Sequence, residues 1–254
     1  MEDCSRNIQL IIEYNGADFS GWQRQDGLPT VQGCVELALK EILGEIPLLV
    51  VAGRTDAGVH ALAQVANFRT KSTIEDWKFS PALNRYLPPE VSIHQSREVK
   101  PDFNARNDSL SKKYRYRIYE GPQRTGLEHQ RAWQWRSTID VGEIEKAATH
   151  LIGEHDFESF RHTECDAEHA IREMFGISVE TSPRPPFGRY IDITFHANAY
   201  CRHMCRILAG TLMEVGLGKR TPESMNTIIE SRHRTAAGQT APAFGLTLLE
   251  VIYP

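Results

Sequence analysis

One order of strands and helices occurs twice along this chain, and the repeat constrains the fold more than any single motif does. In the N-terminal part, apolar residues at every second position predict strands, and apolar residues at helical spacing predict helices. Thr30 is a suitable N-cap for the first helix, and Pro88-Pro89 ends the second. The resulting order is β-α-β-β-α-β, over residues 8–14, 31–42, 46–52, 62–68, 74–86 and 91–99.

The same order returns in the C-terminal part, with insertions. Asp140 and Glu143 resemble a capping box at the start of a helix that ends at Gly153. The other predicted elements are strands at 113–119, 171–180, 189–195 and 246–252 and helices at 199–215 and 222–231. We therefore expect an α+β fold of two ferredoxin-like, RRM-like halves, with domains at 1–103 and 104–254. Neither half carries the glycine and aromatic signature of an RNA-recognition module, so this order alone indicates no function.

Charge is unevenly distributed along the chain. The 254 residues include 29 Lys+Arg and 33 Asp+Glu, a net charge of −4, which excludes a histone-like basic protein. Residues 112–136 nevertheless hold seven cations and two anions, and residues 184–220 hold six cations and two anions. Because salt screens charges beyond about 8 Å, a local basic patch can bind phosphate in an acidic protein. A solvated surface face is the alternative explanation.

No segment is typical of export or of a membrane span. No apolar run approaches the ~18 residues that a spanning helix needs. Glu2 and Asp3 stand where a signal peptide has basic residues. The five cysteines are scattered and contain no Cys-x-x-Cys pair, which argues against a disulfide framework and against a zinc finger. We expect a cytoplasmic protein with reduced thiols.

The segment richest in reactive side chains lies between the second and third predicted strands. It reads Gly53-Arg54-Thr55-Asp56-Ala57-Gly58-Val59-His60. A plain hairpin needs only a few turn residues, so Arg, Thr, Asp and His together favour a functional loop. The structural alternative is a turn in which Asp56 accepts backbone hydrogen bonds and Gly58 takes a positive φ.

This segment, followed by Gln64-Val65 and Phe68, resembles the signature of the TruA family of tRNA pseudouridine synthases. The resemblance covers nearly the whole chain through ordered motifs, among them Tyr14-Asn15-Gly16, Phe19-Ser20-Gly21-Trp22, Phe103-Asn104-Ala105-Arg106, Lys113-Tyr114-Arg115-Tyr116 and His203-Met204-Cys205-Arg206. It implies a pseudouridine synthase fold with a central mixed, mainly antiparallel sheet. It also implies that uridine is isomerised to pseudouridine at positions 38, 39 and 40 in the anticodon stem and loop of tRNA, by a homodimer that needs no cofactor or metal.

The resemblance gives catalytic roles to three residues. Asp56 would be the catalytic carboxylate, either as a nucleophile at C1′ or as a base at the 2′ carbon. Arg206 would keep that carboxylate ionised, although Arg202, four residues earlier on the same predicted helix face, could exchange roles with it. Tyr114 would stack on the flipped uracil, and its hydroxyl could serve the C5 proton transfer. The alternative for Tyr114 is a core aromatic, which is what we expect of Tyr116.

Other residues are candidates for binding substrate. Arg54, Lys113 and Arg115 would join Arg202 and Tyr114 in binding tRNA. His60 is expected to brace the loop.

A cysteine and histidine cluster resembles zinc ligands in composition. It consists of His196, Cys201, His203 and Cys205. Cys201 and Cys205 are predicted to share a helix face while His203 is not, so buried thiols explain the cluster better than a metal does. The chain departs from the family pattern around these cysteines, at Asn104 and over residues 161–169, and these departures concern substrate contacts.

Two other functions stay open at this point. A non-catalytic RNA-binding or tRNA-chaperone protein would explain the basic and aromatic residues but gives no reason for Asp56. A hydrolase of a nucleoside glycosidic bond would pair Asp56 with a second acid such as Asp156 or Glu158.

Overall fold

The computed structural model describes residues 5–254 and divides the chain into two compact units. Unit 1 comprises the residues up to Leu110 together with Leu248–Pro254, and unit 2 comprises Ser111–Thr247. No helix within residues 5–254 is long and apolar enough to cross a membrane. Cys4 lies outside the described residues. The other cysteines are free thiols: Cys34, Cys165, Cys201 and Cys205.

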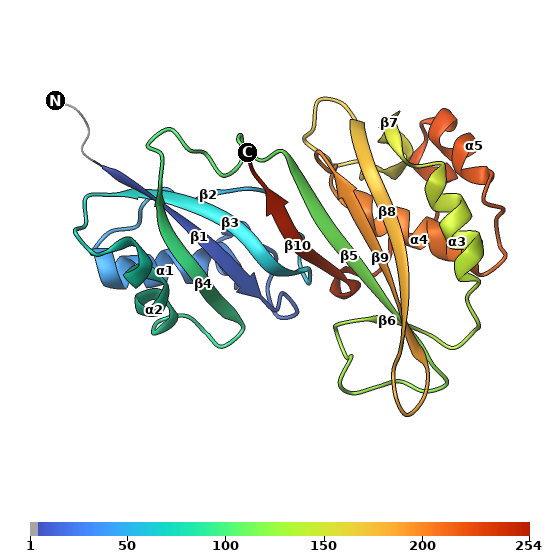
Figure 1. Ribbon diagram of the computed structural model, residues 1–254, viewed down its shortest axis with the longest axis horizontal. Coiled ribbons are helices and arrows are strands. Elements are labelled where there is room, and N and C mark those ends of the chain that lie inside the picture. The colour runs from blue at the N-terminus through green and yellow to red at the C-terminus, as the bar shows by residue number, and fades with distance from the viewer. Residues whose placement is uncertain (1–4) are drawn as a thin grey trace. The chain divides into compact units, whose positions relative to one another are not determined.

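Unit 1 has the predicted β-α-β-β-α-β order (Figure 1). Its elements are β1 (Arg6–Tyr14), α1 (Val31–Leu43), β2 (Val50–Val51), β3 (His60–Thr70), a short helical turn (Asp76–Lys78), α2 (Phe79–Asn84) and β4 (Val91–Val99). The strand order is β4-β1-β3, and β2 also pairs with β3. Strand β1 is antiparallel to both of its neighbours. The last strand, β10 (Leu246–Ile252), begins in unit 2, ends in unit 1 and neighbours β3.

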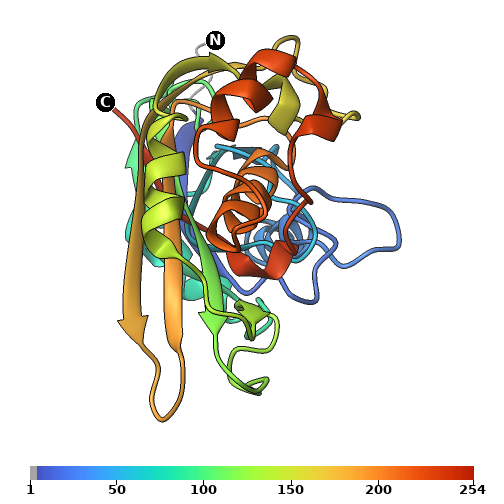
Figure 2. The ribbon, with the colours of Figure 1, turned by 90° about the vertical axis from the view of Figure 1, so that its right-hand side faces the viewer.

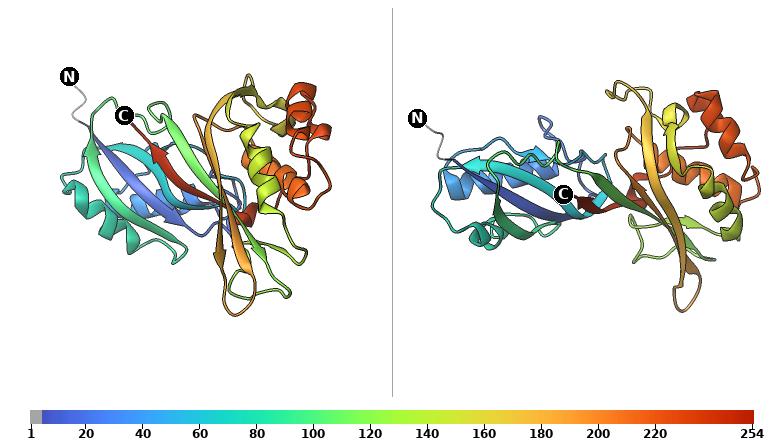
Figure 3. Two further views of the ribbon diagram at one scale, coloured as in Figure 1. Left: turned by 45° about the vertical axis from the view of Figure 1, so that its right-hand side comes forward. Right: turned by 45° about the horizontal axis from the view of Figure 1, so that its top comes forward.

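Burial of apolar side chains places α1 and α2 on one side of the unit 1 strands (Figure 3). Leu10 of β1 is fully buried, and Phe68 of β3 meets Phe79 of α2 edge to face, with ring centroids 5.6 Å apart. Thr30 Oγ1 accepts a hydrogen bond from Gly33 N at 3.3 Å, so the predicted N-cap of α1 is confirmed.

Unit 2 repeats the order with insertions. Its elements are β5 (Ser111–Glu120), β6 (Trp133–Trp135), α3 (Val141–Thr149), β7 (Gly153–Asp156), β8 (Ile171–Pro183), β9 (Arg189–Ala197), α4 (Met204–Gly216) and α5 (Ser224–Ser231). The strand order β5-β9-β8-β7 is antiparallel throughout, whereas β6 runs parallel to β5. Helices α3 and α4 pack against each other beside these strands (Figure 2). The α+β class with a mixed, mainly antiparallel sheet is therefore confirmed.

The two faces of β5 differ as the alternation in its sequence predicts. Tyr116 and Ile118 are fully buried on the face that α4 covers, and Tyr114 is buried on the same face. Arg115 and Arg117 point to the opposite face. Tyr116 Oη donates to the carbonyl oxygen of Pro242 at 2.9 Å, which confirms Tyr116 as a core residue.

Several predicted boundaries are wrong for local reasons. The strand at 46–52 shrinks to β2, because Ile46 and Leu48 are exposed and Pro47 cannot donate to a ladder. The helix at 74–86 reduces to a short turn followed by α2. The helix at 199–215 begins only at Met204, because His203 takes a left-handed conformation with φ of 62°.

Candidate active site

The loop that carries Asp56 is held by backbone hydrogen bonds on both sides. Trp22 N donates to the carbonyl oxygen of Thr55 at 3.0 Å, and Gly58 N donates to the carbonyl oxygen of Phe19 at 3.3 Å. Val59 N donates to the carbonyl oxygen of Asp56 at 3.2 Å, which closes a tight turn with Gly58 at φ of 80°. The turn expected as the structural alternative is thus present, and the carboxylate it carries is half-buried.

Two glycines let neighbouring backbone approach this loop. A Cβ on Gly16 would lie 1.9 Å from the carbonyl oxygen of Val59, and one on Gly21 would lie 2.8 Å from the carbonyl oxygen of Thr55. Gly16 N also donates to His60 Nδ1 at 3.0 Å. This hydrogen bond agrees with the bracing expected of His60, since the imidazole holds the segment that follows β1 against the start of β3.

Tyr114 lies in unit 2, near the start of β5. Its ring meets that of Tyr200 edge to face, with centroids 5.1 Å apart, and Tyr200 Oη donates to the carbonyl oxygen of Lys112 at 3.0 Å. Burial raises the pKa of Tyr200 well above its usual value, so this hydroxyl stays protonated. Tyr200 orients Tyr114, a role that the sequence did not reveal because the helix predicted at 199–215 included Tyr200, which in fact precedes α4.

Arg206 lies in the first turn of α4. Its Nε donates to the carbonyl oxygen of Ala241 at 2.9 Å, and Ala241 N donates back to the carbonyl oxygen of Arg206 at 3.0 Å. Burial raises the pKa of Tyr116, and the positive charge of Arg206 offsets part of that rise. Arg206 and the Tyr116 hydroxyl bind the carbonyls of adjacent residues, Ala241 and Pro242, which brings Arg206 to the face of β5 that carries Tyr114.

Arg202 does not share a helix face with Arg206, and this expectation is wrong. Helix α4 begins at Met204, so Arg202 precedes it. Arg202 Nη1 donates to the carbonyl oxygen of Glu164 at 3.1 Å and lies 3.3 Å from the Glu164 carboxylate. For the same reason Cys201 and Cys205 are not on one helix face.

The cysteine and histidine cluster holds no metal-binding geometry in the described chain. No group of three or more His, Cys, Asp or Glu side chains within residues 5–254 could hold a metal ion. Burial raises the pKa of the Cys201 thiol to about 11, and the His162 and His203 rings are in contact with centroids 4.4 Å apart.

Many arginines of the two basic stretches already have acidic partners. Bidentate hydrogen bonds at 2.8 and 2.6 Å join Arg117 to Asp192. Arg189 pairs with Glu120 at 2.9 Å, and Arg220 pairs with Glu214 at 2.6 Å. Lys113 and Arg115 lie on the face of β5 opposite Tyr114. The cations of β5 therefore lie on the face away from Tyr114, whereas Arg206 of the second stretch lies toward it.

Three exposed arginines of the first basic stretch, residues 112–136, are in no ion pair with a described residue. They are Arg124, Arg131 and Arg136, on or beside the segment between β5 and α3. This segment lies beside the β8–β9 hairpin (Figures 1 and 2), where Arg184 Nη2 donates to Thr125 Oγ1 at 2.6 Å. Arg54, directly before Thr55 in the loop, is exposed as well.

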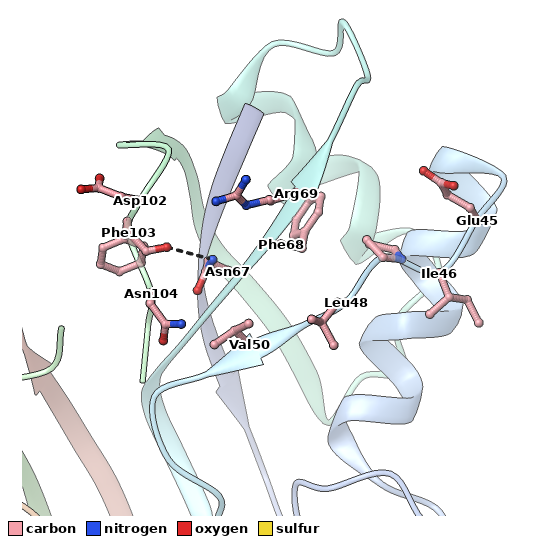
Figure 4. Close-up of a pocket in the computed structure, with 11 residues that line it drawn as sticks. Glu45, Ile46, Leu48, Val50, Asn67, Phe68, Arg69, Asp102, Phe103 and Asn104 are labelled. Atoms are coloured by element: carbon pink, nitrogen blue, oxygen red, sulfur yellow. Dashed lines mark hydrogen bonds between the residues drawn. The ribbon is translucent and has the colours of Figure 1, made fainter. Parts of the chain in front are cut away.

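A cavity of about 280 Å³ lies in unit 1, and Asp56 is not among the residues that line it (Figure 4). It is lined by Leu48, Val50, Phe103 and the far end of β3 at Asn67–Arg69. Asn67 is seven residues along β3 from His60, which corresponds to roughly 23 Å of strand. Asn104 also borders the cavity, and its Oδ1 accepts from Arg106 N at 3.0 Å, so this departure from the family pattern caps a turn.

The loop holds the Asp56 carboxylate in a fixed position, and the molecule also exposes arginines without acidic partners in the described chain. Together these features fit an enzyme that acts on nucleic acid better than a passive binding module. Comparison with known proteins supplies the family. The family described as tRNA pseudouridine synthase matches residues 10–108 and 147–254. This chain belongs to the tRNA pseudouridine synthase family, and the expected fold, enzyme class and activity as an isomerase are confirmed.

The similarity to individual relatives extends over their full length. The chain is 42% identical over 248 residues to tRNA pseudouridine synthase A of Geotalea uraniireducens, covering 98% of this chain and 100% of that protein. It is 42% identical over 248 residues, with the same coverage, to tRNA pseudouridine synthase A of Acetivibrio thermocellus. It is 39% identical over 246 residues to that of Myxococcus xanthus, covering 97% of this chain and 91% of that protein.

Proposed function

We propose that this protein isomerises uridine to pseudouridine at positions 38, 39 and 40 in the anticodon stem and loop of tRNA, with Asp56 as the catalytic carboxylate and no cofactor. The observation that carries the proposal is the loop geometry: backbone hydrogen bonds from Trp22 and Gly58 fix the chain on both sides of Asp56. Such preorganisation favours catalysis, because a reacting carboxylate must be held in a defined geometry.

The reaction conserves every atom and electron. The N1–C1′ bond breaks, the uracil turns while it is held, C5 bonds to C1′, and the proton on C5 moves to N1. Asp56 either attacks C1′ or takes the 2′ proton, and both routes need an ionised carboxylate. Because no electron is transferred, the reaction requires no redox group.

Arg206 and Tyr114 complete the proposed machinery. A guanidinium keeps a neighbouring carboxylate ionised even where substrate excludes water. We assign this part to Arg206 rather than Arg202, because Arg202 is bound to Glu164. Tyr114 would stack on a uracil that has left the helix, and its contact with the Tyr200 ring supports this role by fixing its orientation.

Exposed cations would make the contacts to tRNA outside the reacting base. Arg54 is exposed and next to Thr55 in the loop, which supports a role in binding near the target nucleotide. Arg202, Lys113 and Arg115 remain proposed contacts, and the last two would bind RNA on a surface separate from Tyr114. A homodimer and a cytoplasmic location stay predictions.

One experiment separates the three functions considered. The protein is incubated with unmodified tRNA transcript, and the products are analysed for pseudouridine and for free uracil. Pseudouridine supports the isomerase, free uracil supports a hydrolase, and binding with neither product supports a passive RNA-binding protein. The structure disfavours the hydrolase, because Asp156 pairs with Arg232 at 3.3 Å and Glu158 pairs with Arg161 at 3.2 Å.

A further inference from the structure

Three buried polar side chains form a hydrogen-bonded cluster directly behind the Asp56 loop. Tyr14 is the last residue of β1, Gln64 lies on β3, and Thr55 precedes Asp56. Their exposed fractions are 2%, 0% and 7%. Tyr14 Oη lies 2.7 Å from Thr55 Oγ1, and Gln64 Nε2 donates to Tyr14 Oη in a long hydrogen bond of 3.4 Å. Polar groups at this depth are costly to bury unless they have partners, and these three supply them to one another.

The amide of Gln64 is held in one orientation by its own hydrogen bonds. Its Oε1 accepts from Val65 N at 3.2 Å, and its Nε2 donates to the carbonyl oxygen of Gly53 at 2.8 Å. The amide group is therefore fixed in orientation and offers an N–H to Tyr14. Burial raises the pKa of Tyr14 to about 12, so the phenol keeps its proton at neutral pH. Tyr14 Oη receives the Gln64 N–H and is joined to Thr55 Oγ1 by a hydrogen bond in which either hydroxyl can donate.

The cluster holds the loop at two points before the carboxylate. Gln64 fixes the carbonyl of Gly53, and Tyr14 fixes the side chain of Thr55. The carbonyl of Thr55 is held independently by Trp22 N at 3.0 Å. With its side chain and its carbonyl both bound, Thr55 has little freedom to rotate, and the peptide that links it to Asp56 is fixed with it.

We propose that Tyr14 is a positioning residue for the reaction: its hydroxyl, oriented by Gln64, holds Thr55 so that the Asp56 carboxylate is already placed when tRNA binds. This inference rests on the proposed function, because it gives Tyr14 a role only through Asp56. Tyr14 acts on the geometry of the carboxylate, so it affects the chemical step and leaves tRNA binding unchanged.

The first test replaces Tyr14 by phenylalanine, which keeps the ring and removes only the hydroxyl. A misplacement of about 1 Å at a reacting group can cost about 100-fold in rate. We expect the single-turnover rate of pseudouridine formation to fall by roughly 10- to 100-fold, with the Kd for unmodified tRNA transcript within twofold of the wild type. Tyr253→Phe is the matched control, because Tyr253 Oη donates to the carbonyl oxygen of Ala105 at 2.6 Å in the same unit. This control should keep the wild-type rate.

The second test asks whether Tyr14 acts through Thr55. Thr55→Val removes the hydroxyl with little change in shape, and Thr55→Ser retains it. We expect Thr55→Val to slow the chemical step as Tyr14→Phe does, and the double variant to be no slower than either single variant. Thr55→Ser should retain most of the wild-type rate. Rates are measured well below the thermal midpoint of each variant, so that loss of folded protein does not enter.

An Asp56→Asn arm in the same assay separates this inference from the function on which it rests. Turnover by Asp56→Asn would overturn the proposed function. If Asp56→Asn is inactive while Tyr14→Phe matches Tyr253→Phe within twofold, the positioning role is refuted and the function stands. A Tyr14→Phe variant that loses tRNA affinity but not rate, or effects of Tyr14 and Thr55 that multiply independently, would also refute it.

Discussion

Replacement of Gly16 by alanine measures how closely the end of β1 fits the Asp56 loop. An alanine Cβ would lie 1.9 Å from the carbonyl oxygen of Val59 and 2.6 Å from its carbonyl carbon. Real Cβ atoms essentially never come within 3.0 Å of another heavy atom, so the two backbones must separate by about 1 Å. Gly16 has no positive φ, so the strain comes from space alone.

The surrounding hydrogen bonds determine which segment moves. Gly16 is anchored through both its N–H, to His60 Nδ1 at 3.0 Å, and its carbonyl, which accepts from Phe19 N at 3.0 Å. Val59 N donates to the carbonyl oxygen of Asp56 at 3.2 Å, so a displacement of Val59 is passed to the turn that carries the carboxylate. Overpacking of this kind lowers the free energy of unfolding by about 1–3 kcal/mol, and a shift of about 1 Å at the carboxylate slows the reaction about 100-fold.

The assay combines urea unfolding with single-turnover pseudouridine formation. Gly126→Ala is the control, because a Cβ there meets nothing within 4 Å and Gly126 has no positive φ. We expect this control to match the wild type in both measurements. A Gly16→Ala variant that is as stable and as fast as the wild type would refute the reasoning, since the close approach would then place no constraint on the loop.

Three further predictions follow from the proposed machinery. Asp56→Asn should abolish turnover while tRNA affinity, measured by filter binding, stays within a few-fold, because the change removes only the ionised oxygen; multiple turnovers by the variant would contradict this. Tyr114→Phe should keep base stacking, whereas Tyr114→Leu should lose roughly 1–3 kcal/mol of stacking energy. Equal single-turnover rates and affinities for the two variants would instead show that Tyr114 is a core residue with no part in stacking. Joint replacement of Arg124 and Arg131 by alanine should lower the salt dependence of tRNA binding by about 1–2 in the slope of log K against log salt, whereas Gln123→Ala should leave the slope unchanged.

Much of the fold could be predicted from the sequence because burial imposes a simple period on most strands. The predicted strands at 91–99 and 246–252 match β4 and β10 at both ends, and the Asp140 cap of α3 is present, with Glu143 N donating to Asp140 Oδ1 at 3.1 Å. Strands β6 and β7 were missed because they do not show this period. Each has only three or four residues, too few to show an alternation, and the Gly-Glu-His-Asp sequence of β7 contains no apolar residue.

The residue types of the candidate site could be predicted from the sequence, but the residues that hold the Asp56 loop in place could not. The dense loop around Asp56 was recognisable from its residue types, whereas the roles of Tyr14 and Gln64 depend on strand pairing that brings residues 50 positions apart together. The error over Arg202 arose because one left-handed residue, His203, delays the start of α4, and no helical period reveals such a residue.

The discontinuity of unit 1 has a consequence for how the chain acquires its structure. Strand β3 leads directly out of the Asp56 loop, and one of its neighbours, β10, is synthesised after all the other strands of the two units. The residues between β3 and β10 form a very long loop. Pairing these strands slows folding, because the chain entropy of closing the loop is lost before the stabilising contacts form. All of unit 2 emerges before that pairing is possible, so it can condense first during synthesis. The sheet behind the candidate catalytic loop is therefore completed last, and a chain stalled before β10 would carry the whole loop sequence with an open strand edge beside it.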